Sequence, residues 1–537
     1  MALSEHDLVD AAVYVGLLDR DDLESVQREA RRARLSLSEA VARHVRTPRA
    51  ALWRAVAETR GLPFLGPGDL LPTPSDLDRL PAGFISRRQV LPIRDGRGRL
   101  LAAVANPDDM GALDQLARAL GEEPSLALAH PEALAGAVGR AMGEASAESV
   151  DRESAASLLE EIFADAYLAR ASDVHICPVA NHAEVRLRID GRLQDWRRDL
   201  IRGERDAVIN RVKVLADMDI AESRAPQDGS FEHRLDDFDA AIEIRVSSLP
   251  VKWGERVTMR LLGMQEEGIG LDRLGMPALA RGALRERVRR PHGMILVTGP
   301  TGSGKSTTLY SVLREIDRRQ LNVMTVEDPI EQIVDGAAQV QTTPKVGFAG
   351  ALRSILRQDP DVILIGEIRD GETADIALKA AQTGHLVFST LHTNNAVGAV
   401  TRLTDLGVGP YQIGASLLGV IAQRLTRRLC PRCAQARPAT PEEAALLGVT
   451  DGPPPMIKEP RGCAHCLGTG YIGRVGVFET LWLGDAAAEA IAGRAGERAV
   501  MREAEGFSPI AEDLRAKVLD GTTALSDAIS LGLRPGR

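Results

Sequence analysis

The sequence predicts an α/β fold, built on a parallel sheet that helices cover on both faces. Apolar runs at 294–297, 322–326, 361–365 and 385–389 alternate with segments of helical period. Such alternation is typical of a parallel sheet. A glycine-rich loop follows the first run, and acidic clusters follow the second and third. Because ligands bind at the carboxyl ends of parallel strands, we expect the chemistry to gather at that edge.

The glycine-rich loop has the residue types that hold a nucleoside triphosphate. It reads Gly299-Pro300-Thr301-Gly302-Ser303-Gly304-Lys305-Ser306-Thr307. Its glycines let backbone amides turn toward the phosphates, Lys305 supplies charge for the β/γ oxygens, and Ser306 offers a hydroxyl to Mg²⁺. A helix starting near Ser306 would point its positive end at the same anion. A merely flexible turn would not need lysine and serine at these offsets, so we predict binding of ATP with Mg²⁺.

Two acidic clusters lie at predicted strand ends. They read Glu327-Asp328-Pro329-Ile330-Glu331 and Gly366-Glu367-Ile368-Arg369-Asp370. Triphosphate hydrolysis requires carboxylates that hold Mg²⁺ and orient the attacking water. We expect Glu367 beside the metal and Glu331 to activate the water, with Glu327 and Asp328 as rivals. Helix capping would explain one such cluster, but not two that flank a phosphate loop.

Two histidines, His385 and His392, bracket the last apolar run. Phosphoryl transfer requires positive charge near the γ-phosphate, which histidines and nearby arginines can supply. A lone histidine is usually a core residue. Two at the edge of one strand predict a sensor of the γ-phosphate.

Four of the five cysteines form two pairs with two residues between the members of each pair. Cys430 and Cys433 form the first, and Cys463 and Cys466 the second. This pattern predicts a structural Zn²⁺ site closed by four thiolates. Disulfides, the alternative, suit a reducing compartment badly. The segment between the pairs contains Gly452 and three prolines, which favours a looped-out insertion.

Composition restricts the class of protein. The net charge of −9 and the aromatic share of 3% oppose a chain that coats nucleic acid, so no nucleic-acid partner is expected. No export leader and no run of eighteen apolar residues is visible, which favours a cytoplasmic protein that reaches a membrane through partners.

Six regions are expected along the chain, since 537 residues are too many for one core. They are a helical segment at 1–60, a small α/β module at 61–145, alternating strands after a helix at 151–265, the nucleotide domain at 276–425, the cysteine module at 426–478 and a helical region at 479–537.

With these motifs in hand, the chain resembles the secretion ATPases of the type II secretion and type IV pilus superfamily, most of all those of type II secretion. The resemblance covers roughly 150–485. It is carried by the phosphate loop, the segments 325–331 and 357–370, and a histidine box from Gly384-His385 to His392-Thr393-Asn394.

The resemblance implies a RecA-like P-loop ATPase domain, preceded by a PAS-like α+β domain at 151–265 and a small α/β N-terminal module, with a zinc-binding insertion near the C-terminus. It also implies that arginines close over the nucleotide, and the matching residues are Arg245, Arg260 and Arg353. A homo-oligomer, a hexamer in this family, is expected, peripheral to the inner membrane. Its N-terminal region is expected to dock on the cytoplasmic domain of a membrane-anchored protein, beside an inner-membrane platform protein.

The function implied is ATP hydrolysis that drives pseudopilus assembly and protein export by type II secretion. Three alternatives stay open. They are a type IV pilus extension ATPase, a nucleic-acid motor with a zinc ribbon, and a scaffold that does not hydrolyse ATP.

Overall fold

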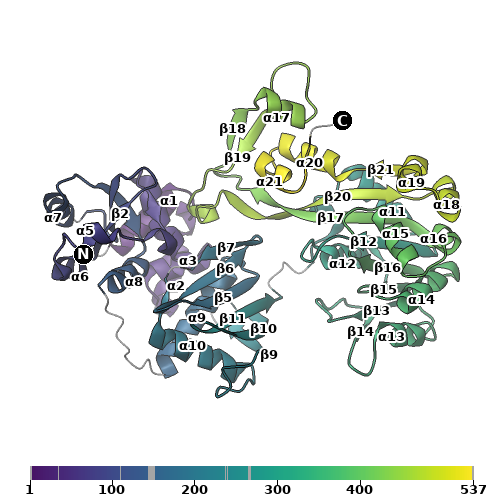
Figure 1. The fold of residues 1–537 in the computed structure, drawn as a ribbon, viewed down its shortest axis with the longest axis horizontal. Helices are drawn as coiled ribbons and strands as arrows, with labels where there is room; N and C mark the ends of the chain where they lie inside the picture. Colours follow the sequence, from purple (N-terminus) through teal and green to yellow (C-terminus); the bar gives the residue numbers. More distant parts are fainter. Residues whose placement is uncertain are drawn as a thin grey trace. The chain divides into compact units, whose positions relative to one another are not determined.

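The structure is a computed structural model, and it describes residues 3–33, 35–108, 110–142, 152–196, 198–235, 238, 240–263 and 268–534. The chain divides into two compact units (Figure 1). Residues 1–265 form the first unit together with two short loops that carry the cysteines, 430–433 and 461–470. The second unit contains 266–429, 434–460 and 471–537.

Four helices open the first unit. Two of them begin with capping boxes, in which Ser4 pairs with Asp7 and Ser36 pairs with Glu39. Each box satisfies backbone N–H groups that a helix start leaves unpaired. The apolar faces of the helices share one core. The helices are α1 Glu5–Tyr14, α2 Leu23–Ala33, α3 Leu37–His44 and α4 Ala50–Thr59.

A four-stranded sheet follows, in the order β1-β4-β3-β2. All five residues of β3 are buried, which explains their continuous apolar run. The strands are β1 Phe64–Leu65, β2 Val90–Arg94, β3 Leu100–Val104 and β4 Ser125–Ala129, and the helices are α5 Pro74–Leu77, α6 Ala82–Arg88, α7 Met110–Leu120 and α8 Pro131–Ala141.

The rest of the first unit is an antiparallel sheet in the order β7-β6-β5-β11-β10-β9, with β8 paired to β6. Its strands alternate buried apolar and accessible polar residues, and helices α9 and α10 share the core with the buried face. The elements are α9 Arg152–Leu168, β5 Asp173–Pro178, β6 His182–Ile189, β7 Arg192–Asp195, β8 Leu200–Ile201, α10 Arg202–Leu215, β9 Gln227–Leu235, β10 Ala240–Val251 and β11 Gly254–Leu262.

An eight-stranded sheet forms the centre of the second unit, in the order β14-β13-β15-β16-β12-β17-β20-β21. The first six strands are parallel to one another, as the sequence predicts, but β20 and β21 are antiparallel additions. The strands are β12 Gly293–Thr298, β13 Val323–Glu327, β14 Ala337–Gln341, β15 Val362–Ile365, β16 Leu386–Leu391, β17 Leu417–Leu429, β20 Tyr471–Trp482 and β21 Gly506–Ser508.

Helices cover both faces of this sheet. Met294 and Leu296 of β12 share a core with α13, α14, α15, α16 and α18, whereas Ile295 and Val297 share another with α11 and α12. Successive side chains of a strand point to opposite faces, so a strand covered on both sides is apolar throughout. The helices are α11 Ala278–Val288, α12 Lys305–Glu315, α13 Phe348–Ile355, α14 Gly371–Gln382, α15 Gly398–Asp405, α16 Pro410–Ser416 and α18 Asp485–Ala492.

Two features of the C-terminal part of the second unit add detail to what the sequence predicts. The sheet runs on past residue 425 through β17, β20 and β21, so the region after 479 is not purely helical. The segment between the cysteine pairs is folded, because its residues share a core with α20 and α21. These elements are β18 Gln435–Pro438, α17 Pro441–Leu446, β19 Met456–Glu459, α19 Glu497–Glu503, α20 Ile510–Leu519 and α21 Leu525–Ser530.

Among the described residues, no helix combines the length and the apolar character that a bilayer crossing requires.

Candidate functional site

The phosphate loop joins β12 to α12, as the sequence predicts. Gly299, Gly302 and Gly304 have φ of 147°, 74° and 85°, a region that favours glycine. At Gly299 a second constraint applies, because an added Cβ would lie 2.3 Å from the carbonyl oxygen of Gln423 in β17. The first glycine is therefore required by backbone conformation and by the close passage of a neighbouring strand.

Lys305 opens α12 and turns back over the loop. Its Nζ donates hydrogen bonds to the carbonyl oxygens of Gly299 and Pro300, at 3.0 and 3.1 Å. Burial lowers the pKa of Lys305, whereas the charges of Glu367 and Glu331 act to raise it. The ammonium group and the first amides of α12 thus lie at the same loop, an arrangement that attracts phosphate.

Acids from neighbouring strand ends meet beside this loop. Glu367 follows β15 and pairs with the Arg369 guanidinium, and its carboxylate lies 3.6 Å from His392 Nε2. Arg369 also lies 3.6 Å from the carboxylate of Asp328, which follows β13. Close contacts among Asp328, Arg369, Glu367 and His392 therefore connect the ends of β13, β15 and β16.

Glu327, a rival for water activation, is occupied by structural contacts. Its side chain is buried and accepts hydrogen bonds from Thr325 Oγ1 at 2.7 Å, Gln339 Nε2 at 3.0 Å and the Tyr310 hydroxyl. A buried carboxylate that already accepts three hydrogen bonds has little capacity to bind and deprotonate an attacking water molecule. The three contacts make Glu327 a less suitable rival for water activation, and its role stays a prediction.

Tyr310 of α12 is a site residue that the sequence analysis missed. Its hydroxyl donates to Glu327 and accepts the backbone N–H groups of Glu331 and Gln332, at 3.1 and 3.2 Å. Burial and the neighbouring Glu327 raise the pKa of this phenol, which therefore stays protonated. A tyrosine on the buried face of the helix after a phosphate loop was the available signal, since a buried phenol needs a partner.

Glu331 is the acid that remains available. It is exposed, and its carboxylate forms no hydrogen bond or ion pair with any residue that the structure describes. Its backbone is held by Tyr310, as above. Asp328, the other rival, faces Arg369. Of the three acids, Glu331 is thus the one whose carboxylate has no partner among the described residues, and its role in water activation stays a prediction.

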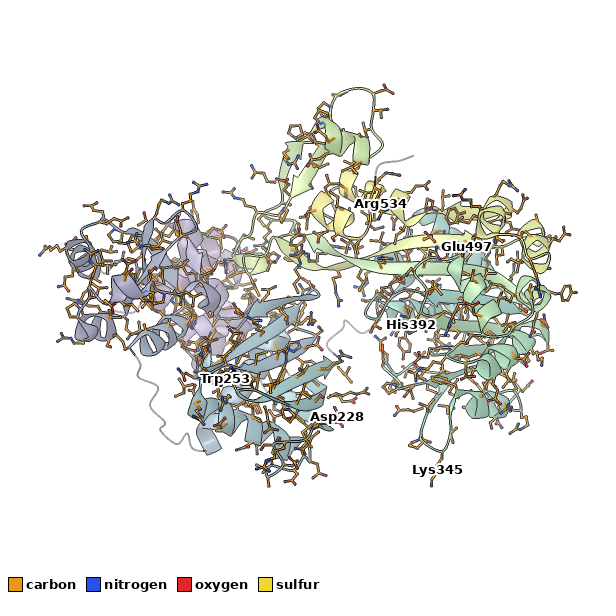
Figure 2. The ribbon with its side chains drawn as sticks, viewed as in Figure 1. Asp228, Trp253, Lys345, His392, Glu497 and Arg534 are labelled. Carbon is orange, nitrogen blue, oxygen red and sulfur yellow. The ribbon has the colours of Figure 1, made fainter. Side chains whose placement is uncertain are left out.

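The two predicted histidines lie at opposite ends of β16. His392 (Figure 2) follows β16, and the next residue, Thr393, donates its backbone N–H to Thr298 Oγ1 at 2.8 Å, beside the phosphate loop. His385 precedes β16, and its carbonyl oxygen accepts the N–H of Gly293 at the start of β12. Because a six-residue strand spans roughly 20 Å, His385 lies away from the phosphate loop of its own unit.

The predicted arginines lie on two different units. Arg353 of α13 pairs with Glu372 in the first turn of α14. Arg245 and Arg260 lie in the first unit, directly opposite each other on β10 and β11. Arg260 Nε lies 3.1 Å from a carboxylate oxygen of Asp173, a buried acid on β5 that the sequence analysis did not single out. Their role at a nucleotide stays a prediction.

The four paired cysteines converge. Their sulfur atoms all lie within 4.8 Å of one another, with Cys430 to Cys463 at 3.9 Å, Cys433 to Cys466 at 3.8 Å and Cys463 to Cys466 at 3.7 Å. Tetrahedral Zn²⁺ with bonds of about 2.3 Å places its sulfur ligands about 3.8 Å apart, whereas a disulfide requires about 2.05 Å. The spacing therefore fits a Zn²⁺ ion.

Hydrogen bonds favour the thiolate form at one of the four positions, Cys466. The Cys463 thiol and the backbone N–H groups of Cys463 and Gly470 lower the pKa of Cys466 to about 4. A thiolate is the form that binds metal. The donor set is thus compatible with zinc.

Comparison with known proteins places this architecture in a family. A family model described as "Type II/IV secretion system protein" matches residues 148–530, and one described as "MshEN domain" matches 60–148. Type II secretion system protein E of Pseudomonas aeruginosa is 43% identical over 456 residues, which cover 83% of this chain and 88% of that protein. Type II secretion system ATPase E of Vibrio cholerae is 46% identical over 388 residues, covering 71% and 76%.

Two further relatives extend the comparison. The type IV pilus assembly ATPase PilB of Thermus thermophilus is 38% identical over 510 residues, which cover 89% of this chain and 57% of that protein. The X-ray structure of the Legionella pneumophila ATPase DotB matches with a TM-score of 0.52 at 22% identity, covering 70% of this chain and 95% of that one, and supports the fold alone. The predicted family and enzyme class are confirmed: this chain belongs to the type II/IV secretion system protein family, and it is an ATPase.

Proposed function

We propose that this ATPase drives a type II secretion system, in which ATP hydrolysis powers pseudopilus assembly and the export of folded proteins from the periplasm across the outer membrane. The similarity to type II secretion proteins over most of both chains supports this. A role in type IV pilus assembly is the second candidate, because PilB is also a relative. Type II secretion is favoured, since the match to PilB leaves much of that protein uncovered.

One observation carries the hydrolytic part of the proposal. The Glu331 carboxylate is unpaired among the described residues, while its backbone is held by Tyr310 on the helix that carries Lys305. Lys305 draws the β/γ-phosphates into the loop. Glu331 then orients a water molecule against the γ-phosphorus and accepts its proton.

Ser306 and Glu367 are the residues that would hold Mg²⁺. When bound, this ion neutralises charge on the β- and γ-phosphates. Arg369 and His392 flank Glu367 and fix the orientation of its carboxylate. Glu367 therefore faces the loop as a carboxylate with restricted motion.

Hydrolysis must then alter the arrangement of the chain. A ligand shifts a conformational equilibrium only through different affinities for the two states. Lys305, Arg245, Arg260 and His392 are the groups that we propose to contact the γ-phosphate in one state. Hydrolysis would remove these contacts. Within the first unit, Arg260 Nε lies 3.1 Å from a carboxylate oxygen of Asp173.

The remaining parts of the proposal concern assembly. We infer a hexamer in the cytoplasm, peripheral to the inner membrane, whose N-terminal module docks on the cytoplasmic domain of a membrane-anchored protein and which acts on an inner-membrane platform protein. Zn²⁺ held by the four cysteines is proposed as structural, because protein thiolates fill all four positions.

The test uses a host strain that lacks the gene. Wild-type and Lys305→Ala chains are expressed in it, and exported protein in the medium and surface pili are measured separately. We expect the wild-type chain alone to restore export, with no effect on pili. Restored pili without restored export would transfer the proposal to pilus assembly, and export restored by Lys305→Ala would refute a motor role.

A further inference from the structure

The second cysteine pair completes the core of the N-terminal helices. Ala464, between Cys463 and Cys466, is fully buried in the cluster that α1–α4 form. Apart from Ala464 and Leu128, every buried member of that cluster comes from residues 3–57. Figure 1 shows the cysteine-bearing loop beside α1. The loop is therefore part of the packing of the N-terminal module.

Two hydrogen bonds also join the cysteine loops to the N-terminal helical region. The Glu58 carboxylate of α4 accepts the backbone N–H of Ala464 at 3.1 Å. The Arg432 guanidinium, between Cys430 and Cys433, donates to the carbonyl oxygen of Gly16, just after α1. Both cysteine pairs thus contact the N-terminal helices through hydrogen bonds whose partners lie more than 400 residues apart in sequence.

Arg54 of α4 supplies a charge at this interface. Its guanidinium stacks over the Phe64 ring at 4.4 Å, and a Cβ added to Gly468 would lie 2.2 Å from Nη1. No carboxylate of a described residue forms an ion pair with it. Burial lowers the pKa of Arg54, whereas the charges of Cys466, Asp69, Cys463 and Glu58 act to raise it. Four thiolates around Zn²⁺ carry a net charge of about −2. A half-buried guanidinium needs anionic groups nearby, and a zinc–thiolate cluster would add its charge to those of Asp69 and Glu58.

The loop also packs against the core of the antiparallel sheet of the same unit. Leu467, the residue after Cys466, packs against the core that α9, α10 and the sheet share. Ala464 and Leu467 therefore insert into two different cores. The four sulfur atoms constrain the conformation of the loop. This conformation determines whether Ala464 and Leu467 reach their two cores.

We propose that the tetracysteine centre is the anchor for the N-terminal helices of its own chain, with Arg54 and Glu58 as the recognition residues. Zinc holds the two cysteine loops in the conformation in which Ala464, Arg432 and Gly468 contact the N-terminal helices. Loss of zinc therefore removes these contacts and releases α1–α4 from the loops. The cysteine loops thus contact the face of α4 that carries Arg54 and Glu58. This inference goes beyond the motor function and does not depend on which machine the ATPase drives.

The first experiment compares hydrogen exchange of the full-length protein before and after zinc is removed by a chelator. We expect exchange of amides in residues 5–59 to rise by about tenfold or more, while peptides from β12 and α12 keep their protection as an internal reference. Unchanged exchange in 5–59 after complete zinc loss would overturn the proposal. So would a purified protein that contains no zinc and yet protects these helices.

The second experiment separates recognition from general folding. Arg54→Met keeps the aliphatic stem but removes the charge, and Arg60→Met is the matched control, because Arg60 pairs instead with the exposed Asp108. We expect Arg54→Met to release zinc to a chromogenic chelator about 10- to 100-fold faster, and Arg60→Met to release it at the wild-type rate. Equal rates for Arg54→Met and wild type would contradict the role of Arg54.

Glu58 offers a further pair of variants. Glu58→Gln retains an oxygen that accepts the Ala464 N–H, whereas Glu58→Ala does not. We expect increased exchange in α4 for Glu58→Ala and near-native exchange for Glu58→Gln. The same exchange in both variants would show that this hydrogen bond does not hold the helices.

Discussion

The hydroxyl of Tyr310 donates a hydrogen bond to the buried carboxylate of Glu327. This contact joins the helix after the phosphate loop to the end of β13. The same hydroxyl accepts the N–H groups of Glu331 and Gln332, so a phenol fixes the backbone beside the proposed catalytic acid.

Tyr310→Phe removes that hydroxyl while keeping the ring. The buried Glu327 loses a donor and two amides lose an acceptor, so we expect the free energy of unfolding to fall by about 1–3 kcal/mol. Because the Glu331 backbone is released, we also expect kcat to fall by roughly ten- to hundredfold. Chemical denaturation and steady-state ATPase assays measure the two effects. Tyr411→Phe, at a residue that is 78% exposed, is the control and should change neither.

Glu331→Gln and Glu327→Gln should separate chemistry from structure. We expect Glu331→Gln to lose about 10²–10⁴-fold in kcat, because an amide cannot accept the proton, with ATP affinity and stability near wild type. Glu327→Gln should lower stability first, because the amide group adds donors where Tyr310 and Thr325 already donate. Turnover near wild type in Glu331→Gln, with nucleotide affinity retained, would move the role to Asp328.

Lys305→Ala should abolish turnover and leave the fold intact. Loss of the cation at the β/γ-phosphates is expected to lower kcat by at least about 10²-fold, and circular dichroism should match that of the wild type. Lys345→Ala, at an exposed lysine that Figure 2 labels, is the matched control and should hydrolyse ATP normally. Steady-state activity retained by Lys305→Ala would contradict the assignment of the phosphate loop.

Gly299→Ala and Gly302→Ala should differ in severity. Both glycines have positive φ, but the added methyl meets the Gln423 backbone at 2.3 Å at Gly299 and open space at Gly302. We expect Gly299→Ala to lose measurable nucleotide binding, since the loop or β17 must shift. Gly302→Ala should lose about 1–2 kcal/mol of stability from strain, and fluorescent ATP analogues should still bind. Equal affinity in both variants would argue against the close approach of β17.

Zinc content tests the cysteine cluster. The purified protein should contain one zinc ion per chain by atomic emission, and Cys463→Ser should contain none. Cys177→Ser is the control, because Cys177 lies on β5 and burial raises the pKa of its thiol, so its zinc content should match the wild type. Zinc content that is lost equally in both serine variants would show that the four-sulfur site is not the zinc site.

The local parts of the nucleotide site could be predicted from sequence. The residues from Gly299 to Ser306 are contiguous, and the strand ends before Asp328, Glu367 and His392 are marked by apolar runs. Parallel strands bring their carboxyl ends to one edge, so proximity of these groups follows from topology. The same rule places His385 at the far edge, because it precedes its strand rather than following it.

Contacts between distant segments could not be predicted in this way. The periodicity of α12 indicates that Tyr310 is buried, but not that it meets Glu327 and the backbone of Glu331. Nor does a motif indicate that Gln423 passes beside Gly299, or that Glu58 meets Ala464. Such contacts depend on how whole helices and strands pack together. The identity of a single residue does not indicate which distant residue it will contact.

The sequence by itself determined the phosphate loop, the paired cysteines and the alternation of strands and helices, because residue type, spacing and period are local properties of the chain. Tertiary structure decided which acid keeps a carboxylate without partners among the described residues, and what the cysteine loops pack against. The reason is that burial and pairing depend on residues from several elements. Glu327 and Glu331 are the same residue type four positions apart, but Glu327 is buried against Tyr310, Thr325 and Gln339, whereas Glu331 is exposed.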